Sequence, residues 1–176
     1  MNIDQHYVQV MKEIELGHRA LVRFSSDELD ILNEKLNDSQ DQELEKVLCL
    51  VEHSAALFQK FEEHLIKILQ GNHSTRIKIF ALNSARKHII LARFQKGQRL
   101  HFEFLEVLKN LLKDKSPELV EWTLRTIEEC GNQGVYFLRE FDKIKPPPWK
   151  WFNPHQRAVR EIITLLERRW SRFERS

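Results

Sequence analysis

The sequence predicts an all-α protein of about eight helices, in which helical hairpins stack on one another. The chain has 176 residues, 41% of them hydrophobic, which suits one globular domain or one short array of repeats. It contains only 5 glycines and 5 prolines, and three of the prolines are adjacent at 146–148, so most of the chain lacks helix breakers. Along most segments, apolar residues recur every three or four positions, which is the spacing of one helical face.

The first expected helix covers roughly residues 2–23. Its apolar residues are Ile3, Tyr7, Val10, Met11, Ile14, Ala20 and Leu21. Ser25 then stands three residues before Glu28, the arrangement of a capping box, in which each side chain accepts a hydrogen bond from the other residue's backbone N–H. Residues 29–36 continue an apolar stripe, so a short second helix is expected after this cap.

Residues 41–70 can form one long helix or two helices that join near Ser54, and we favour two. Apolar residues then repeat at helical spacing over 77–92, and a second helical run covers 101–113. Gly97 separates these runs, so we expect a helical hairpin.

A further hairpin begins at Ser116. This serine can cap a helix whose first residue is Pro117, because proline lacks the N–H that a first helical residue leaves unpaired. Gly131 is a plausible end for this helix, and a shorter helix is expected to follow it through Phe141.

The expected helix starts near Gln40, Ser74 and Ser116 recur at intervals of about 34 and 42 residues, within the range of stacked two-helix repeats. The stretch LLKDKSPELVEWTLRTIEECG, residues 111–131, resembles a HEAT repeat, with Asp114 in the turn between helices. It departs from HEAT repeats at Glu121, where an arginine is common. The resemblance implies a short right-handed α-solenoid and carries no catalytic residue.

We therefore expect three parts within one domain. Residues 1–145 would hold the HEAT-like repeats with N-terminal capping helices, and 146–153 would form a proline and aromatic connector. The C-terminal capping helix would cover 154–176, because Asn153 and Pro154 are a strong start signal. The apolar face of this helix lies opposite the arginines Arg157, Arg160, Arg168, Arg169, Arg172 and Arg175.

Charge is distributed unevenly along the chain. Residues 1–70 hold 7 Lys/Arg and 14 Asp/Glu, whereas 71–176 hold 21 and 12. On one helix four cations share a single arc opposite the apolar face: Arg76, Arg86, Lys87 and Arg93. This stripe can contact an acidic partner or a phosphate backbone. The alternative is that acidic and basic helices neutralise one another within the fold.

The connector KPPPWKWFNP, residues 145–154, concentrates prolines and aromatics. We favour a packing role, in which the aromatic side chains clamp the connector onto the last hairpin. In the functional alternative, Trp149 and Trp151 anchor a partner, since exposed aromatic side chains bind peptides and stack on bases.

No catalytic, nucleotide-binding or metal-binding motif occurs, so we expect no enzyme activity, no cofactor and no metal. His88 lies on an apolar face and is interpreted as a core histidine, and Cys49 and Cys130 as buried thiols. We find no signal peptide and no apolar run long enough to span a membrane, so we expect a cytoplasmic protein.

The sequence therefore predicts a non-enzymatic interaction or adaptor module that binds an acidic protein or peptide through a basic groove. One alternative is a nucleic-acid-binding solenoid that resembles DNA-alkylation-repeat proteins, although the catalytic residues of that family cannot be placed on this sequence. Another is a structural subunit of an oligomer. The partner's identity and the oligomeric state are not set by the sequence.

Overall fold

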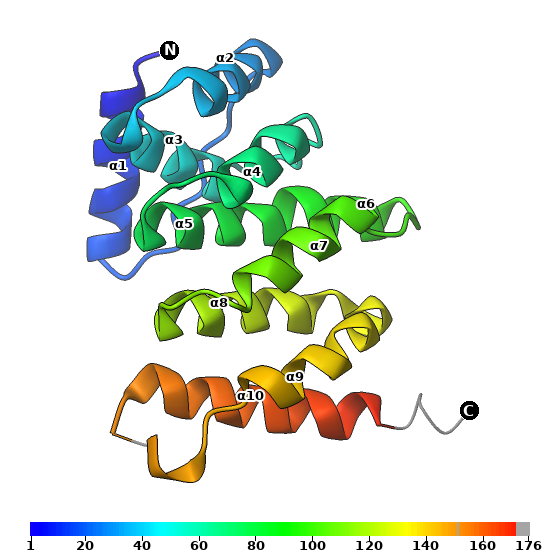
Figure 1. Cartoon of the computed structure of the whole chain (residues 1–176). Coiled ribbons are helices and arrows are strands. Elements are labelled where there is room, and N and C mark those ends of the chain that lie inside the picture. The colour runs from blue at the N-terminus through cyan, green and yellow to red at the C-terminus, as the bar shows by residue number, and fades with distance from the viewer. Residues whose placement is uncertain (151, 172–176) are drawn as a thin grey trace. The chain divides into compact units, whose positions relative to one another are not determined.

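A computed structural model describes residues 1–150 and 152–171 of the chain. Every regular element in these residues is a helix (Figure 1), which confirms the all-α prediction. The chain forms two compact units, Met1–Gln98 and Arg99–Ser176, which are described separately below. No helix in the described part of the chain is both long and apolar enough to cross a membrane.

The first unit is a group of helices around a core centred on α3. In chain order they are α1 (Ile3–Glu15), α2 (Ser26–Asp38), α3 (Asp41–Glu52), α4 (Phe61–Gln70), α5 (Thr75–Ala85), η1 (Arg86–Leu91) and α6 (Ala92–Gln95). α3 packs against α1, α2 and α5, and α4 packs against α2, α5 and η1. The predicted capping box begins α2: Ser25 Oγ accepts from the backbone N–H of Glu28, and the Glu28 carboxylate accepts from the N–H of Ser25.

The first helix ends earlier than predicted, at Glu15. Gly17 follows with a φ of +73°, a left-handed conformation that glycine adopts without steric cost and that turns the chain away from the helix. The segment after it is held by tertiary contacts instead. The N–H of Val22 donates to the carbonyl of His53 at 2.8 Å, and the N–H of Ala55 donates to the carbonyl of Val22 at 2.7 Å.

These two hydrogen bonds also lie at the break between α3 and α4. The expectation of two helices within residues 41–70 is confirmed, since α3 ends at Glu52 and α4 begins at Phe61. The break uses its free backbone groups to bind the extended segment that follows α1.

The longest helical run of the first unit passes from α5 through η1 into α6 without interruption, and η1 is a π-helix. A π-helical turn holds more residues than an α-helical turn, so it shifts which side chains face inward. Here three consecutive residues are buried, His88, Ile89 and Ile90. The shift places His88 inside the unit.

The second unit is built around α8. Its elements are α7 (Phe102–Leu111), α8 (Pro117–Glu129), η2 (Gly131–Phe137), α9 (Leu138–Ile144), η3 (Pro148–Lys150) and α10 (Pro154–Trp170). α8 packs against α7 and, most extensively, against α10. Ser116 and Asn153 cap α8 and α10 through their side-chain oxygens, as the sequence predicts. The segment after Gly131 begins with a 3₁₀-helix, η2, before the short helix α9.

Trp170 closes the core of the second unit. Its side chain is 1% exposed and stacks on Phe141, with ring centroids 6.2 Å apart. The indole also lies against Gly134, where a Cβ atom would lie 2.1 Å from the ring. The ring therefore fills the space that the missing side chain of Gly134 leaves.

Glu121, the residue that departs from the HEAT pattern, joins two helices of this unit. Its carboxylate is bound by Arg125 of the same helix at 2.7 Å and by the ring nitrogen of His155 on α10 at 2.8 Å. The connector and α10 both lie within the second unit. The finer division into repeats, connector and capping helix stays a prediction.

Candidate functional site

The basic stripe of the first unit faces acidic and carbonyl groups of α3, of α4 and of the segment between them. Arg93 shows this most clearly: its guanidinium binds both carboxylate oxygens of Glu62, with Nη2 to Oε2 at 2.8 Å and Nε to Oε1 at 3.0 Å. The two side chains are only 7% and 9% exposed. Contact between Arg93 and a partner would require this buried pair to break.

The other cations of the stripe also have partners in the first unit. Arg76 lies 2.5 Å from the carboxylate of Glu45, although its side chain is 70% exposed. The ammonium of Lys87 donates to the backbone carbonyls of Glu52 and Ser54, and burial lowers the pKa of this lysine. Arg86 is half-buried; burial raises the pKa of the Glu52 carboxyl, and the positive charge of Arg86 partly opposes that rise. These contacts are of the kind expected if the two charged segments neutralise each other, and the partner-binding role of the four residues stays a prediction.

His88 is a core histidine with both ring nitrogens bound. Nε2 lies 2.8 Å from the carbonyl of Val51, and Nδ1 accepts from the N–H of Phe58 at 3.1 Å. A carbonyl can only accept, so Nε2 carries the proton and the ring is neutral. Burial lowers the pKa of His88 to about 4, because the charged imidazolium would lose its hydration. The residue stabilises the junction of α3, α4 and η1.

The two thiols are also internal. Burial raises the pKa of Cys49 to about 12, and it raises the pKa of Cys130 as well. A thiol with a raised pKa is a poor nucleophile, since the thiolate is the reactive form. Among residues 1–150 and 152–171, no group of three or more His, Cys, Asp or Glu side chains is placed to hold a metal ion.

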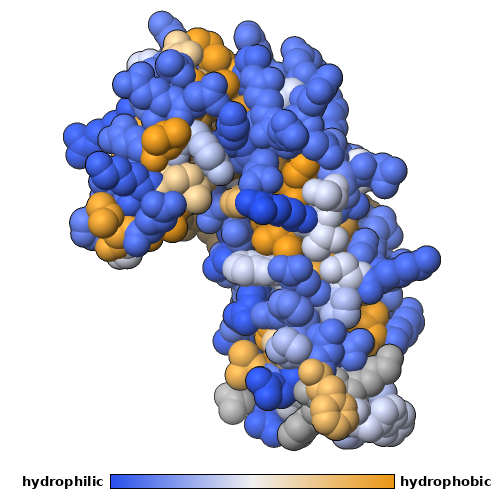
Figure 2. Space-filling model, turned by 90° about the vertical axis from the view of Figure 1, so that its left-hand side faces the viewer, coloured by the Kyte–Doolittle hydropathy of each residue, from blue (hydrophilic) through white to orange (hydrophobic). Residues whose placement is uncertain are grey.

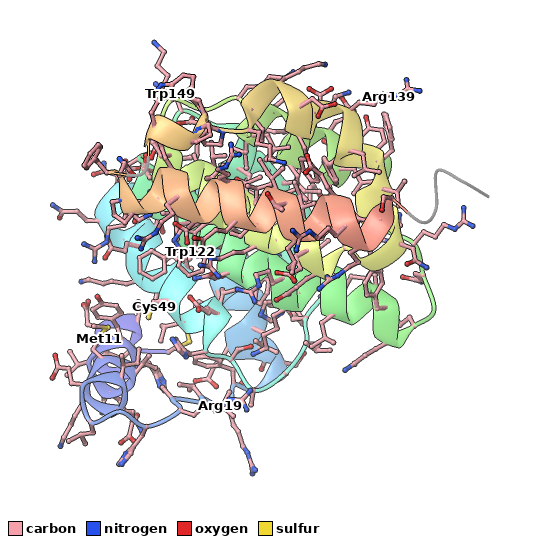
Figure 3. All side chains as sticks on the ribbon, turned by 90° about the horizontal axis from the view of Figure 1, so that it is seen from below. Met11, Arg19, Cys49, Trp122, Arg139 and Trp149 are labelled. Carbon is pink, nitrogen blue, oxygen red and sulfur yellow. The ribbon has the colours of Figure 1, made fainter. Side chains whose placement is uncertain are left out.

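Two aromatic side chains of the connector, those of Trp149 and Phe152, lie in solvent. Trp149 is 75% exposed and Phe152 is fully exposed, so the interpretation that they clamp the connector onto the preceding hairpin is wrong for these two residues. Trp149 belongs to the short helix η3 (Pro148–Lys150), and Phe152 directly precedes Asn153, the residue that caps α10. Trp151 lies outside the described residues. Figure 3 shows Trp149 on the connector, well separated from Arg139 on α9.

A second cationic surface lies on the outer face of α10. A cavity of about 240 Å³ runs along it and is lined by Arg157, Arg160, Glu161, Thr164, Leu165 and Arg168. We call this the arginine groove. These positions lie three or four residues apart, so they share one face of the helix, opposite the buried residues Val159, Ile163 and Leu166.

The charges of the arginine groove are only partly compensated. Arg157 lies 4.0 Å from Glu161, and both side chains are more than half exposed, so their attraction is weak. Arg160 donates to the backbone carbonyl of Pro146 at 2.7 Å and keeps its full charge, because a carbonyl is not an anion. Arg168 is exposed. Three arginines and one carboxylate thus line the groove, which gives it a net positive charge.

In the sequence, this groove is visible as the row of arginines opposite the apolar face of α10. These arginines are not among the residues that are expected from the sequence to contact a partner. The reason is that the sequence shows a denser cluster of cations at 76–93 and does not show which cluster is internally paired. Arg169, from the same row, illustrates the point, because it binds Glu128 of α8 at 3.0 Å.

The face of the molecule shown in Figure 2 is mainly hydrophilic, with hydrophobic residues in small separate groups. Comparisons of the chain with protein-family models, with curated proteins and with solved structures found no match.

Proposed function

We propose that this chain is a non-enzymatic interaction module whose helices form a short right-handed, HEAT-like α-solenoid. Serine caps support the repeat interpretation: Ser74 caps α5 and Ser116 caps α8, each with its Oγ accepting from the N–H three residues later. So does Asp114 in the turn before Pro117. Helix pairs of this kind bury their apolar faces on neighbours and leave other helix faces for partners.

The arginine groove is the observation that carries the functional proposal, and we propose an acidic protein segment as its ligand. A guanidinium has a planar fork of N–H donors that binds a carboxylate through two parallel hydrogen bonds. Arg157 and Arg168 are separated by three helical turns, about 16 Å at 1.5 Å per residue. An extended peptide covers that distance in about five residues. The groove thus matches a short acidic segment.

A protein ligand suits this groove better than a nucleic acid does. Glu161 lies between the arginines, and Leu165 lines the same surface with 49% of its area exposed. A carboxylate in the row repels phosphates, whereas an exposed leucine favours contact with an apolar side chain. The second unit as a whole holds 15 Lys/Arg against 12 Asp/Glu, which is a modest excess for a surface that tracks a phosphate backbone.

The test is a binding titration with a fluorescein-labelled peptide in which glutamates alternate with serines. The double charge reversal Arg157→Glu with Arg168→Glu is expected to lower the affinity by about tenfold or more, because it replaces attraction with repulsion at both ends of the groove. Arg139→Glu provides the matched control, since Arg139 is an exposed arginine of the same unit that lines no part of the groove.

Equal losses in the groove variant and in the Arg139 variant would overturn the proposed site. A labelled DNA duplex and a labelled RNA oligonucleotide are titrated alongside the peptide. Tighter binding of either one, with an affinity that falls steeply and linearly in log–log form with salt, would overturn the choice of a protein ligand in favour of nucleic acid.

A further inference from the structure

A second cavity of about 240 Å³ lies beside the proline connector in the second unit. It is lined by Leu112, Lys113, Asp114, Lys115, Pro117, Val120, Ile144, Pro146, Gln156 and Val159. We call it the connector pocket. Its floor is part of the hydrophobic core, since Leu112, Val120 and Val159 are between 2% and 7% exposed. The bottom of the pocket is therefore apolar and nearly inaccessible to solvent, while the charged and polar residues of the lining lie toward its opening.

Of the connector side chains that the structure describes, that of Pro146 lines this pocket. Pro146 contributes a small, rigid ring to the wall, while the large aromatics Trp149 and Phe152, further along the connector, are exposed. Two contacts hold the connector in place: Arg160 donates to the carbonyl of Pro146 at 2.7 Å, and Lys145 forms an ion pair with Glu167. A fixed wall over an apolar floor is a preformed site, which lowers the entropic cost of binding.

The size of the connector pocket suits a single side chain. A cavity of about 150 Å³ in a protein core holds one benzene molecule, and pockets for drug-sized ligands measure about 300–1,000 Å³. At about 240 Å³ the connector pocket lies between these limits. It can therefore take a phenylalanine or leucine side chain, and it is small for a cofactor.

The rim of the connector pocket is cationic. Lys113, Asp114 and Lys115 are all exposed at its edge, and the Asp114 carboxylate accepts from the N–H of Ser116 at 2.8 Å. A hydrogen bond from a neutral N–H does not offset the charge of a carboxylate. A ligand whose apolar side chain enters the pocket thus meets two ammonium groups and one carboxylate, which together leave the entrance with a net positive charge. Acidic residues on either side of the apolar one complement this rim.

The connector pocket and the arginine groove border the same two turns of α10. Gln156 and Val159 line the pocket, while Arg157 and Arg160 line the groove. Arg160 joins the two, because it lines the groove and holds the carbonyl of Pro146 in the pocket wall. One peptide can therefore contact both sites.

We infer that the connector pocket binds one aromatic or branched aliphatic side chain of the acidic segment that occupies the arginine groove. This inference rests on the proposed function. It defines the ligand as a short linear segment with a single large apolar residue next to a run of carboxylates. The groove supplies the charge contacts along the segment, and the pocket selects the segments that carry the apolar residue.

The experiment compares two labelled peptides that differ at one position, a glutamate-rich peptide with one phenylalanine and the same peptide with alanine there. Burial of the phenylalanine ring is expected to make the first peptide bind roughly tenfold to a hundredfold more tightly. Gln156→Phe places a ring at the pocket entrance and is expected to bring the affinity for the phenylalanine peptide down to that for the alanine peptide. Gln42→Phe, at an exposed site in the first unit, is the matched control.

A second variant keeps the test valid if Gln156→Phe fails to fold. Lys113→Glu with Lys115→Glu changes only exposed rim residues, and it is expected to weaken both peptides while preserving the ratio between them. Equal affinities of the two peptides for the unmodified protein would refute the pocket inference, and so would a ratio that survives Gln156→Phe. If either result is found but the Arg157→Glu with Arg168→Glu variant loses binding, the arginine groove is still supported as the binding site and only the pocket inference fails. If neither peptide binds, the proposed function itself fails.

Discussion

Replacement of Gly134 by alanine tests whether the second unit depends on the contact between this glycine and Trp170. The added Cβ would lie 2.1 Å from the Cη2 atom of the indole and 2.3 Å from Cζ2, whereas ordinary carbon contacts are about 3.5–4.0 Å. Either the ring or the η2 backbone must therefore move by more than 1 Å, roughly the shortfall between those distances. Because Trp170 is 1% exposed and stacked on Phe141, that movement must disturb the packing of the core.

The expected cost of Gly134→Ala is about 3 kcal/mol in the free energy of unfolding. Insertion of a methyl group into a packed core costs about 1–3 kcal/mol, and the severity of this overlap places the variant at the upper end. The smaller conformational entropy that alanine has in the unfolded chain offsets less than about 1 kcal/mol of this cost. Urea denaturation followed by tryptophan fluorescence and by circular dichroism measures the change.

Two further variants separate overlap from backbone strain. Gly131→Ala meets no atom within 4 Å but has a φ of +59°, so it is expected to cost only the left-handed penalty of about 1–2 kcal/mol. Trp170→Leu combined with Gly134→Ala should recover part of the loss in a double-mutant cycle, because the smaller side chain leaves room for the methyl group. A Gly134→Ala variant as stable as the parent, or a coupling energy near zero, would refute the reasoning.

The first unit yields two further predictions. Glu62→Ala should lower the free energy of unfolding by about 3–5 kcal/mol, measured by urea denaturation, because it leaves the buried Arg93 guanidinium without its carboxylate. The double variant with Arg93→Met should be less destabilised than Glu62→Ala alone. A larger loss in the double variant would contradict a buried ion pair. For His88, the unfolded chain binds a proton near pH 6.5 but the folded chain only near pH 4, so the stabilisation is complete above pH 6.5 and is lost as the pH falls to 4. The loss of stability amounts to about 3 kcal/mol. This loss should be absent in His88→Gln and retained in His18→Gln, where the replaced histidine is exposed. The same pH dependence of stability in the parent and in both variants would contradict the role of His88.

The local start and stop signals of most helices could be predicted from the sequence because they act over a few residues. Ser25, Ser116 and Asn153 each bond to an N–H within three positions of themselves, and Pro117 and Pro154 fit the first turn of a helix through their own ring geometry. The first helix is the instructive exception. Its apolar spacing continues to Leu21, but residues after Gly17 pair with the backbone at 53–55, which no local pattern indicates.

The candidate site could be predicted only in kind. A cationic surface was expected, and the sequence shows two rows of basic residues, at 76–93 and 157–175. Which row remains available depends on partners that are distant in sequence. Arg93 meets Glu62 across 31 residues, while Arg157 and Arg160 have no carboxylate of another helix beside them among the described contacts. Electrostatic pairing across a fold is therefore not visible in a single row of charges.

By itself the sequence determined that this chain is helical, where most of its helices begin, and that its basic charge gathers in two segments, because hydrophobic periodicity and capping act between near neighbours. The tertiary structure decided the rest: the end of α1 at Glu15, the burial of Arg93, the exposure of Trp149, and the open pocket beside Pro146. Each of these depends on which side chains meet through space. A contact between distant residues is set by the packing of whole helices, and that packing is the sum of many small apolar contacts rather than the property of any one segment.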